Sequence, residues 1–234
     1  MRMRLLAALA VCWLGTTVAA NAAPVNIWST SFDTGFFETL GPSPFSSLGV
    51  SFGGGTLTPS ESLPGFGTQY FRNDTSGTTT FSASGLGAHT ALRLTFDLAF
   101  LDSWDGLDGT ITPDILFLAI DGSPYLQLTA INASGSAPMF GPGVVVSTGT
   151  NLAQNSGWTD TVVHYDLLIP HSAASFLFAI NFGGAGFQGG LDESWGIDNF
   201  SLAADTVPEP MTLSLMGAGL AAFAVRRRRR LAKS

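Results

Sequence analysis

The 234-residue chain has very few cysteine and basic residues outside its two ends. Its single cysteine, Cys12, lies within the first 22 residues, so the rest of the chain can form neither a disulfide nor a cysteine-based zinc site. Between residues 23 and 205 only Arg72 and Arg93 are basic, against sixteen Asp and Glu residues, which gives a net charge of −14. Such a surface repels nucleic acid phosphates, which excludes DNA or RNA as a partner, and it attracts divalent cations.

The same region also lacks any long stretch with apolar residues at helical 3.6-residue spacing. It is rich in Gly, Ser and Thr, but eighteen Phe and five Trp in the whole chain supply more apolar area than disordered segments contain. Alternating or continuous apolar residues predict strands over residues 25–31, 78–82, 91–100, 115–120, 163–169 and 176–182.

Glycine-containing turns separate these strands, and Asp121-Gly122 predicts a hairpin. The pattern predicts an all-β fold, an antiparallel two-sheet, jelly-roll-like sandwich. The continuously apolar run Ile115–Ile120 predicts a strand covered on both sides, and residues 41–68 are expected to form a long irregular loop.

The N-terminus has the three parts of a secretory signal peptide. A basic start, Met1–Arg4, precedes the apolar stretch Leu5–Val18, and the small residues Ala20-Asn21-Ala22 form an A-x-A cleavage site. We therefore predict a signal helix in residues 1–22, export through the secretion translocon and cleavage by signal peptidase. The alternative is a buried N-terminal helix.

The C-terminus combines a proline-containing motif, an apolar run over 211–225 and a basic cluster. The motif is Val207, Pro208, Glu209 and Pro210, and the cluster is Arg226, Arg227, Arg228, Arg229 and Arg230. As a helix the run spans about 22 Å, less than the bilayer core of about 30 Å, although arginine side chains extend its reach. Because arginines remain on the cytoplasmic side, one interpretation is a membrane anchor that halts export.

These three parts in this order resemble the PEP-CTERM sorting signal. The resemblance covers the last eighth of the chain. It implies that a membrane exosortase processes the protein for the cell surface or extracellular matrix, after 211–225 insert transiently into the inner membrane. It also implies a Gram-negative-type bacterium that makes exopolysaccharide. The predicted domains are a signal peptide (1–22), a secreted β-domain (23–205) and a sorting signal (206–234).

Two segments of the β-domain place carboxylates around a Ser-Trp pair, and we call them the Ser-Trp segments: Asp102–Gly106 and Asp192–Asn199. Carboxylate oxygens in loops suit calcium, and the candidate ligands are Asp102, Asp105, Asp108, Asp192, Glu193 and Asp198. In one alternative these side chains only cap their own turns. In another, two of them act as the acid and base of a glycan-active hydrolase or lyase, if the segments meet.

The apolar alternation slips within the second Ser-Trp segment. Trp195 and Ile197 share one face, whereas Phe200 and Leu202 take the other. A slip of this kind predicts a β-bulge at Asp198-Asn199.

Several residues beside turns are candidates for sugar recognition, by ring stacking and hydrogen bonding: Trp104, Trp158, Trp195 and Asn199. The alternative is that the tryptophans plug the ends of the sandwich, which we favour for Trp195 because it precedes a strand. The histidines His89, His164 and His171 are scattered in the sequence and are expected at surface or turn positions. Arg72 is expected to pair with one of the many carboxylates.

The stretch Asp97–Gly106, followed downstream by Asp192–Asn199, resembles a β-sandwich domain common among exosortase-sorted surface proteins. The resemblance covers residues 65–203 and implies the fold but no activity. The sequence thus predicts a non-enzymatic binding or structural protein associated with exopolysaccharide, with calcium as the candidate cofactor. The alternatives are a secreted glycan-active enzyme and a matrix component without a defined ligand.

Overall fold

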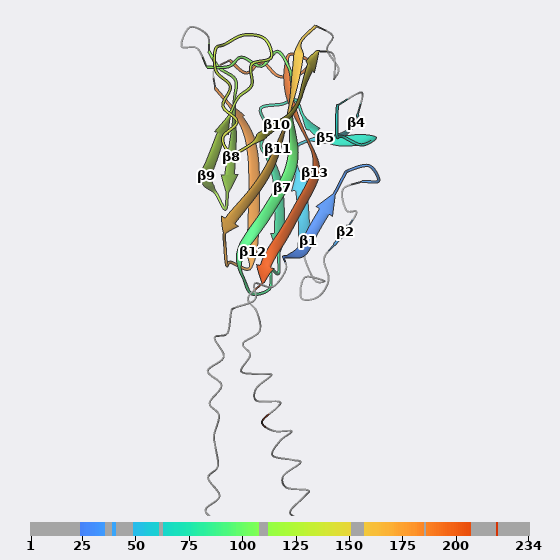
Figure 1. Ribbon diagram of the computed structural model, residues 1–234, viewed down its shortest axis with the longest axis vertical. Coiled ribbons are helices and arrows are strands. Elements are labelled where there is room, and N and C mark those ends of the chain that lie inside the picture. Colours follow the sequence, from blue (N-terminus) through green and yellow to red (C-terminus); the bar gives the residue numbers. More distant parts are fainter. Residues whose placement is uncertain are drawn as a thin grey trace, which may run out of the picture. The chain divides into compact units, whose positions relative to one another are not determined.

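The computed structural model describes residues 24–35, 39–40, 49–60, 63–107, 112–150, 157–184, 186–206 and 219. Within them, thirteen strands form two antiparallel sheets that enclose one core (Figure 1). The predicted all-β, two-sheet sandwich is therefore confirmed.

The first sheet, sheet A, has eight strands and holds both Ser-Trp segments. They are β1 (Val25–Thr30), β2 (Thr39–Leu40), β4 (Thr56–Pro59), β5 (Gln69–Asn73), β7 (His89–Asp102), β10 (Val144–Thr150), β11 (Thr159–Pro170) and β13 (Glu193–Thr206). The order is β10-β11-β7-β13-β1-β2, with β5 paired to β13 and β4 paired to β5. Strand β10 is thus one free edge of sheet A within the described residues.

The second sheet, sheet B, has five strands: β3 (Gly49–Gly53), β6 (Thr79–Ser84), β8 (Ile115–Ile120), β9 (Ser123–Leu128) and β12 (Ser175–Gly183). Their order is β3-β6-β12-β8-β9. The chain crosses between the sheets from β6 to β7 to β8, and again from β11 to β12 to β13, as in a jelly roll. Residues 41–68 are not one long loop, because β3 and β4 lie within them; this expectation was wrong.

Alternating side chains from both sheets build the core. On β7 the side chains of Leu92, Leu94, Phe96, Leu98 and Phe100 are all fully buried, as the period-two pattern predicts. Phe96 contacts Phe178 of sheet B with ring centroids 5.4 Å apart. Large aromatic rings thus join the two layers, which compensates for the absence of disulfides.

The predicted β-bulge in β13 is present. The register to β7 shifts between Asp198 and Ser201, and Asn199 takes a φ of 50°. The extra residue resets the alternation, so that Trp195 and Ile197 before the bulge and Phe200 after it all face the same core.

The predicted hairpin at Asp121-Gly122 joins β8 to β9, with φ angles of 50° and 76° that suit a type I′ turn. Strand β8 differs from the expectation of burial on both faces. Leu116 and Leu118 are buried, whereas Phe117 between them is only half-buried, because one face of sheet B is turned outward.

No helix among the described residues is long and apolar enough to cross a membrane. The predicted signal helix (1–22) and the sorting signal at 207–210 and 226–230 lie outside the described residues. The same holds for the apolar run 211–225 except Gly219, which is helical. The helical structure expected for these two ends therefore stays a prediction.

Candidate functional site

The two Ser-Trp segments meet at the end of the sandwich where β7 stops and β13 starts, which is uppermost in Figure 1. Asp102 pairs with Glu193 across the two strands. The backbone N–H of Ser103 donates to the carbonyl of Asp192 at 2.8 Å, and its hydroxyl donates to the Asp192 carboxylate at 2.6 Å. Antiparallel pairing thus places the carboxylates of both segments beside one another, as the calcium and enzyme hypotheses both require.

Trp104 and Trp195 belong to the core and offer no surface to a sugar. Both side chains are fully buried. The Trp104 indole packs edge-on against Phe100 at 4.9 Å, and its N–H donates to the carbonyl of Ser194 at 2.8 Å. The predicted sugar-stacking roles of Trp104 and Trp195 are therefore wrong, because the sandwich end needs large rings to close it. The predicted burial of Trp195 is confirmed.

Asp102 and Glu193 are only 1% exposed, although both carry a carboxyl group. The backbone N–H of Asp102 binds the carboxylate of Asp160 at 2.9 Å, and Asp102 has a positive φ of 70°. Glu193 Oε2 accepts the backbone N–H groups of Gln188 at 2.6 Å and Gly189 at 3.0 Å. Burial raises the pKa of Glu193, partly offset by these two hydrogen bonds.

Asp114 joins this group and was missed from the sequence. It lies directly before β8, is 1% exposed, and accepts the backbone N–H of Asp105 through Oδ2 at 2.7 Å. Its other oxygen, Oδ1, is buried and has no hydrogen-bond partner among the described residues. Its pKa is raised to about 7, mainly by burial and to a smaller extent by the charges of Glu193, Asp105 and Asp192, although the backbone hydrogen bond from Asp105 acts in the opposite direction. No periodic pattern marks a carboxylate of this kind; only its place before a buried strand could have suggested it.

We call Asp105, Asp114, Asp192 and Glu193 the acidic group. Asp105 and Asp192 are half-buried, and Asp105 also accepts the hydroxyl of Ser134 at 2.6 Å. The described residues contain no set of three or more His, Cys, Asp or Glu side chains placed to hold a metal ion. The predicted ligand Asp108 lies outside the described residues.

Asp198 lies apart from the acidic group, which corrects its prediction as a ligand of the same calcium site. Asp198 pairs with Asp97, five residues before Asp102 on β7, a separation of about 17 Å along the strand. Asp198 is fully buried and accepts the backbone N–H of Gly67 at 3.0 Å. Burial raises its pKa to about 7, despite this bond.

The exposed Asn199 sits at the bulge, and its side chain points to polar neighbours on the protein itself. Its amide donates to Asp97 at 2.8 Å and to the carbonyl of Gly65 at 2.9 Å. Trp158, by contrast, is 38% exposed, immediately before β11. Of the three tryptophans predicted to bind ligand, Trp158 is therefore the one whose ring can reach a partner.

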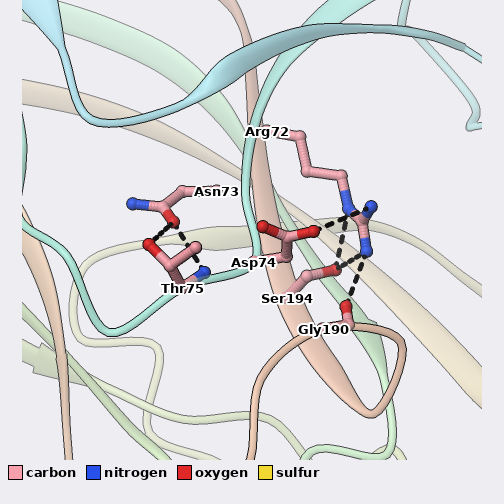
Figure 2. Close-up of polar contacts among 6 residues, drawn as sticks. All are labelled: Arg72, Asn73, Asp74, Thr75, Gly190 and Ser194. Atoms are coloured by element: carbon pink, nitrogen blue, oxygen red, sulfur yellow. Dashed lines mark hydrogen bonds and ion pairs between the residues drawn. The ribbon is translucent and has the colours of Figure 1, made fainter.

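Arg72 connects β5 to the loop before β13 (Figure 2). Its guanidinium, in a residue only 6% exposed, donates to Ser194 Oγ at 2.9 and 3.1 Å and to the carbonyl of Gly190 at 3.0 Å. Asp74 lies 3.6 Å from Nη1, which confirms the predicted pairing with a carboxylate. Arg72 thus fixes the strand that carries Glu193.

The histidines are less scattered in space than in sequence. His89 and His171 come together at the opposite end of β7, with His89 Nε2 2.7 Å from His171 Nδ1. His171 Nε2 lies 3.1 Å from the Asp121 carboxylate. His89 is only 3% exposed and is the first residue of β7, so the prediction of a surface or turn position was wrong for it.

Residues 206–229 match the PEP-CTERM protein-sorting motif, as the resemblance predicted. This motif indicates an exported protein that an exosortase processes at the membrane. No protein with a curated description matches the chain.

Solved structures with a similar arrangement of strands include two carbohydrate-binding modules. TmCBM61, in complex with β-1,4-galactotriose, shares 14% identity and a TM-score of 0.36, covering 75% of this chain and 94% of the module. The xylan-binding CBM22-1 domain of Paenibacillus barcinonensis Xyn10C shares 13% identity and a TM-score of 0.33, covering 81% of this chain and 100% of the domain.

Proposed function

We propose that this protein is a non-catalytic β-sandwich that holds calcium at the acidic group and works on the cell surface or in the extracellular matrix. The observation that carries the proposal is Asp114. Its carboxyl group is almost fully buried, one oxygen has no partner among the described residues, and the negative charges of three further acidic residues act on it. A buried charge without a partner is unfavourable, and a cation is the simplest compensation in a domain with so few basic residues.

Calcium suits these residues because it accepts carboxylate, carbonyl and hydroxyl oxygens in irregular geometry. A calcium site can therefore take some of its ligands from backbone carbonyl and hydroxyl oxygens, and it needs fewer carboxylates than a site formed by acidic side chains alone. Asp114 and Asp105 would be the central ligands, since each is already joined to the other by backbone hydrogen bonds. Asp192 and Glu193 would add further negative charge close to the bound calcium ion.

The burial of the carboxylates favours a structural over a catalytic role. A glycosidase acid or base must reach the scissile bond of a polymer. Asp102, Asp114 and Glu193 are each only 1% exposed. A surface groove of about 370 Å³ lies elsewhere, over the ion pair between Arg93 and Asp166.

A calcium titration of thermal stability tests the proposal. Extracellular calcium modules have a Kd of about 10⁻⁴–10⁻³ M, so about 10 mM calcium should stabilise the fold by about 1.4–2.7 kcal/mol. EDTA should lower the Tm of the exported protein and calcium should restore it. Asp114→Asn should abolish the response, whereas Asp166→Asn, remote from the acidic group, should keep it. A wild-type Tm that ignores both EDTA and calcium would sink the proposal.

We further propose that the protein associates with exopolysaccharide through Trp158. The exposed indole ring can stack on a sugar ring, an interaction of apolar area and specific geometry. In co-sedimentation with exopolysaccharide from the producing cells, Trp158→Ala should reduce the bound fraction. Tyr125→Ala, a change of a similarly exposed aromatic on β9, is the matched control. Equal binding by wild type and Trp158→Ala would contradict this role.

Delivery to the surface has its own test. A chain ending at residue 205 lacks the sorting motif and should fail to reach the cell surface or matrix. Surface accessibility of the full chain and the shortened chain can be compared by protease treatment of intact cells. Identical surface levels would refute sorting by this motif.

A further inference from the structure

One continuous stretch of the domain contains no charged residue. From Gly122 to Thr159 the sequence contains no Asp, Glu, Lys, Arg or His, within a domain of net charge −14. This stretch includes β9 at one edge of sheet B and β10 at one edge of sheet A. The segment between them packs against both sheets: Gly141 lies against Leu126 and Leu128 of β9, and the carbonyl of Phe140 accepts the hydroxyl of Tyr165 on β11 at 3.1 Å.

Strand β10 exposes apolar side chains within this uncharged stretch. Val144, Val145 and Val146 are 65%, 46% and 56% exposed. In an isolated domain, three neighbouring exposed valines on an edge strand are unfavourable, because their apolar area stays in water.

Edge strands of monomeric proteins are normally protected by charges or prolines. Strand β9 follows this rule, because Pro124 removes one backbone donor. Strand β10 contains neither proline nor a charged residue. A bulge at Val146 divides it, and Ser147–Thr150 continue in regular register with β11. That regular part leaves alternate N–H and C=O groups directed away from β11.

We propose that the β10 edge is a homotypic interface, at which Val144–Thr150 of two copies pair antiparallel about a twofold axis. A second copy fits better than a different acidic or basic partner, since this edge has no charge to recognise one. Two domains of −14 repel each other elsewhere, so the uncharged edge is where identical copies can approach. Pairing would satisfy the backbone groups that β10 leaves unpaired within the described residues, and it would cover the three valines with the Ser147–Thr150 half of the other copy.

Sedimentation equilibrium of the exported full chain tests the interface. Wild type should form dimers, and about 0.5 M salt should strengthen them, because salt screens the repulsion between like-charged domains. Val145→Lys should raise the dimer Kd at least tenfold, since lysine on an edge opposes strand pairing.

Leu168→Lys is the matched control, because Leu168 is 63% exposed on β11. This variant should dimerise like wild type, and both variants should keep the wild-type Tm at a protein concentration low enough for all three proteins to be monomeric. Wild-type protein that stays monomeric at high salt would overturn the proposal. So would equal weakening by Val145→Lys and Leu168→Lys, which would place the contact elsewhere.

Discussion

Replacement of Asp114 by asparagine should stabilise the calcium-free domain, and by more at higher pH. Asparagine has the same shape and keeps an oxygen for the backbone N–H of Asp105, which donates to Asp114 Oδ2 at 2.7 Å. It carries no charge, so the buried position no longer has to hold a carboxylate.

The magnitude follows from the pKa of Asp114. Burial raises this pKa from the ordinary 3.8 to about 7. Between about pH 4 and pH 7 the unfolded chain has lost the proton while the folded chain keeps it, so stability falls as pH rises through this window. The shift of about three units corresponds to about 4 kcal/mol at pH 8, at about 1.4 kcal/mol per unit.

Urea unfolding in EDTA, followed by tryptophan fluorescence, measures the effect. The advantage of Asp114→Asn over wild type should grow by about 1.4 kcal/mol per pH unit from pH 5 to pH 7 and then level off. With saturating calcium the advantage should disappear, because the ion stabilises the ionised carboxylate.

Asp166→Asn is the control, because the pKa of Asp166 is shifted in the opposite direction to that of Asp114. Hydrogen bonding to Arg93 lowers the pKa of Asp166, so its charged form is favoured in the fold. This variant should gain no stability at high pH. The reasoning would be refuted if the advantage of Asp114→Asn were the same at pH 5 and pH 8.

Three further substitutions test the framework around the site, each by urea unfolding. Arg72→Met should cost about 2–4 kcal/mol, because it leaves the buried acceptors Ser194 Oγ and the Gly190 carbonyl without their donor; a cost below about 0.5 kcal/mol would contradict this. Trp104→Ala should cost about 3–5 kcal/mol as a large-to-small core change, and a surface-like cost would refute its core role. Gly122→Ala should cost about 1–2 kcal/mol, because φ is 76° there; no change would argue against the type I′ turn.

Local sequence patterns predicted the strands well where one face is buried. The alternation in β7 sets which side chains face the core, because strand side chains alternate with period two. The turn residues of the Asp121-Gly122 hairpin and the phase slip at Asp198-Asn199 were equally readable, since both reflect backbone geometry within a few residues. Residues 41–68, with many glycines and prolines and no clear alternation, gave no such signal, and two strands there were missed.

The candidate site was only partly predictable. The repeated Ser-Trp pairs marked the segments that meet, but not the burial of Trp104, which depends on how both sheets close at this end. Asp198 lies in the same Ser-Trp segment as Asp192 and Glu193. The strand register nevertheless places Asp198 about 17 Å along the strand from Glu193. Asp114 stands out in no periodic pattern, and its proximity to Asp192 and Glu193 depends on how distant segments fold together.

The sequence by itself determined the charge, the lack of disulfides, the strand alternation and the sorting motif, because each depends on composition or on residues close together in the chain. The tertiary structure decided which carboxylates are neighbours and which lose their water. Desolvation depends on everything that packs around a group, and here the fold brings Glu193 near to Asp105 and Asp114 from a distant part of the chain. The sequence shows only that the domain has many acidic residues, whereas the fold determines that these particular ones form the acidic group.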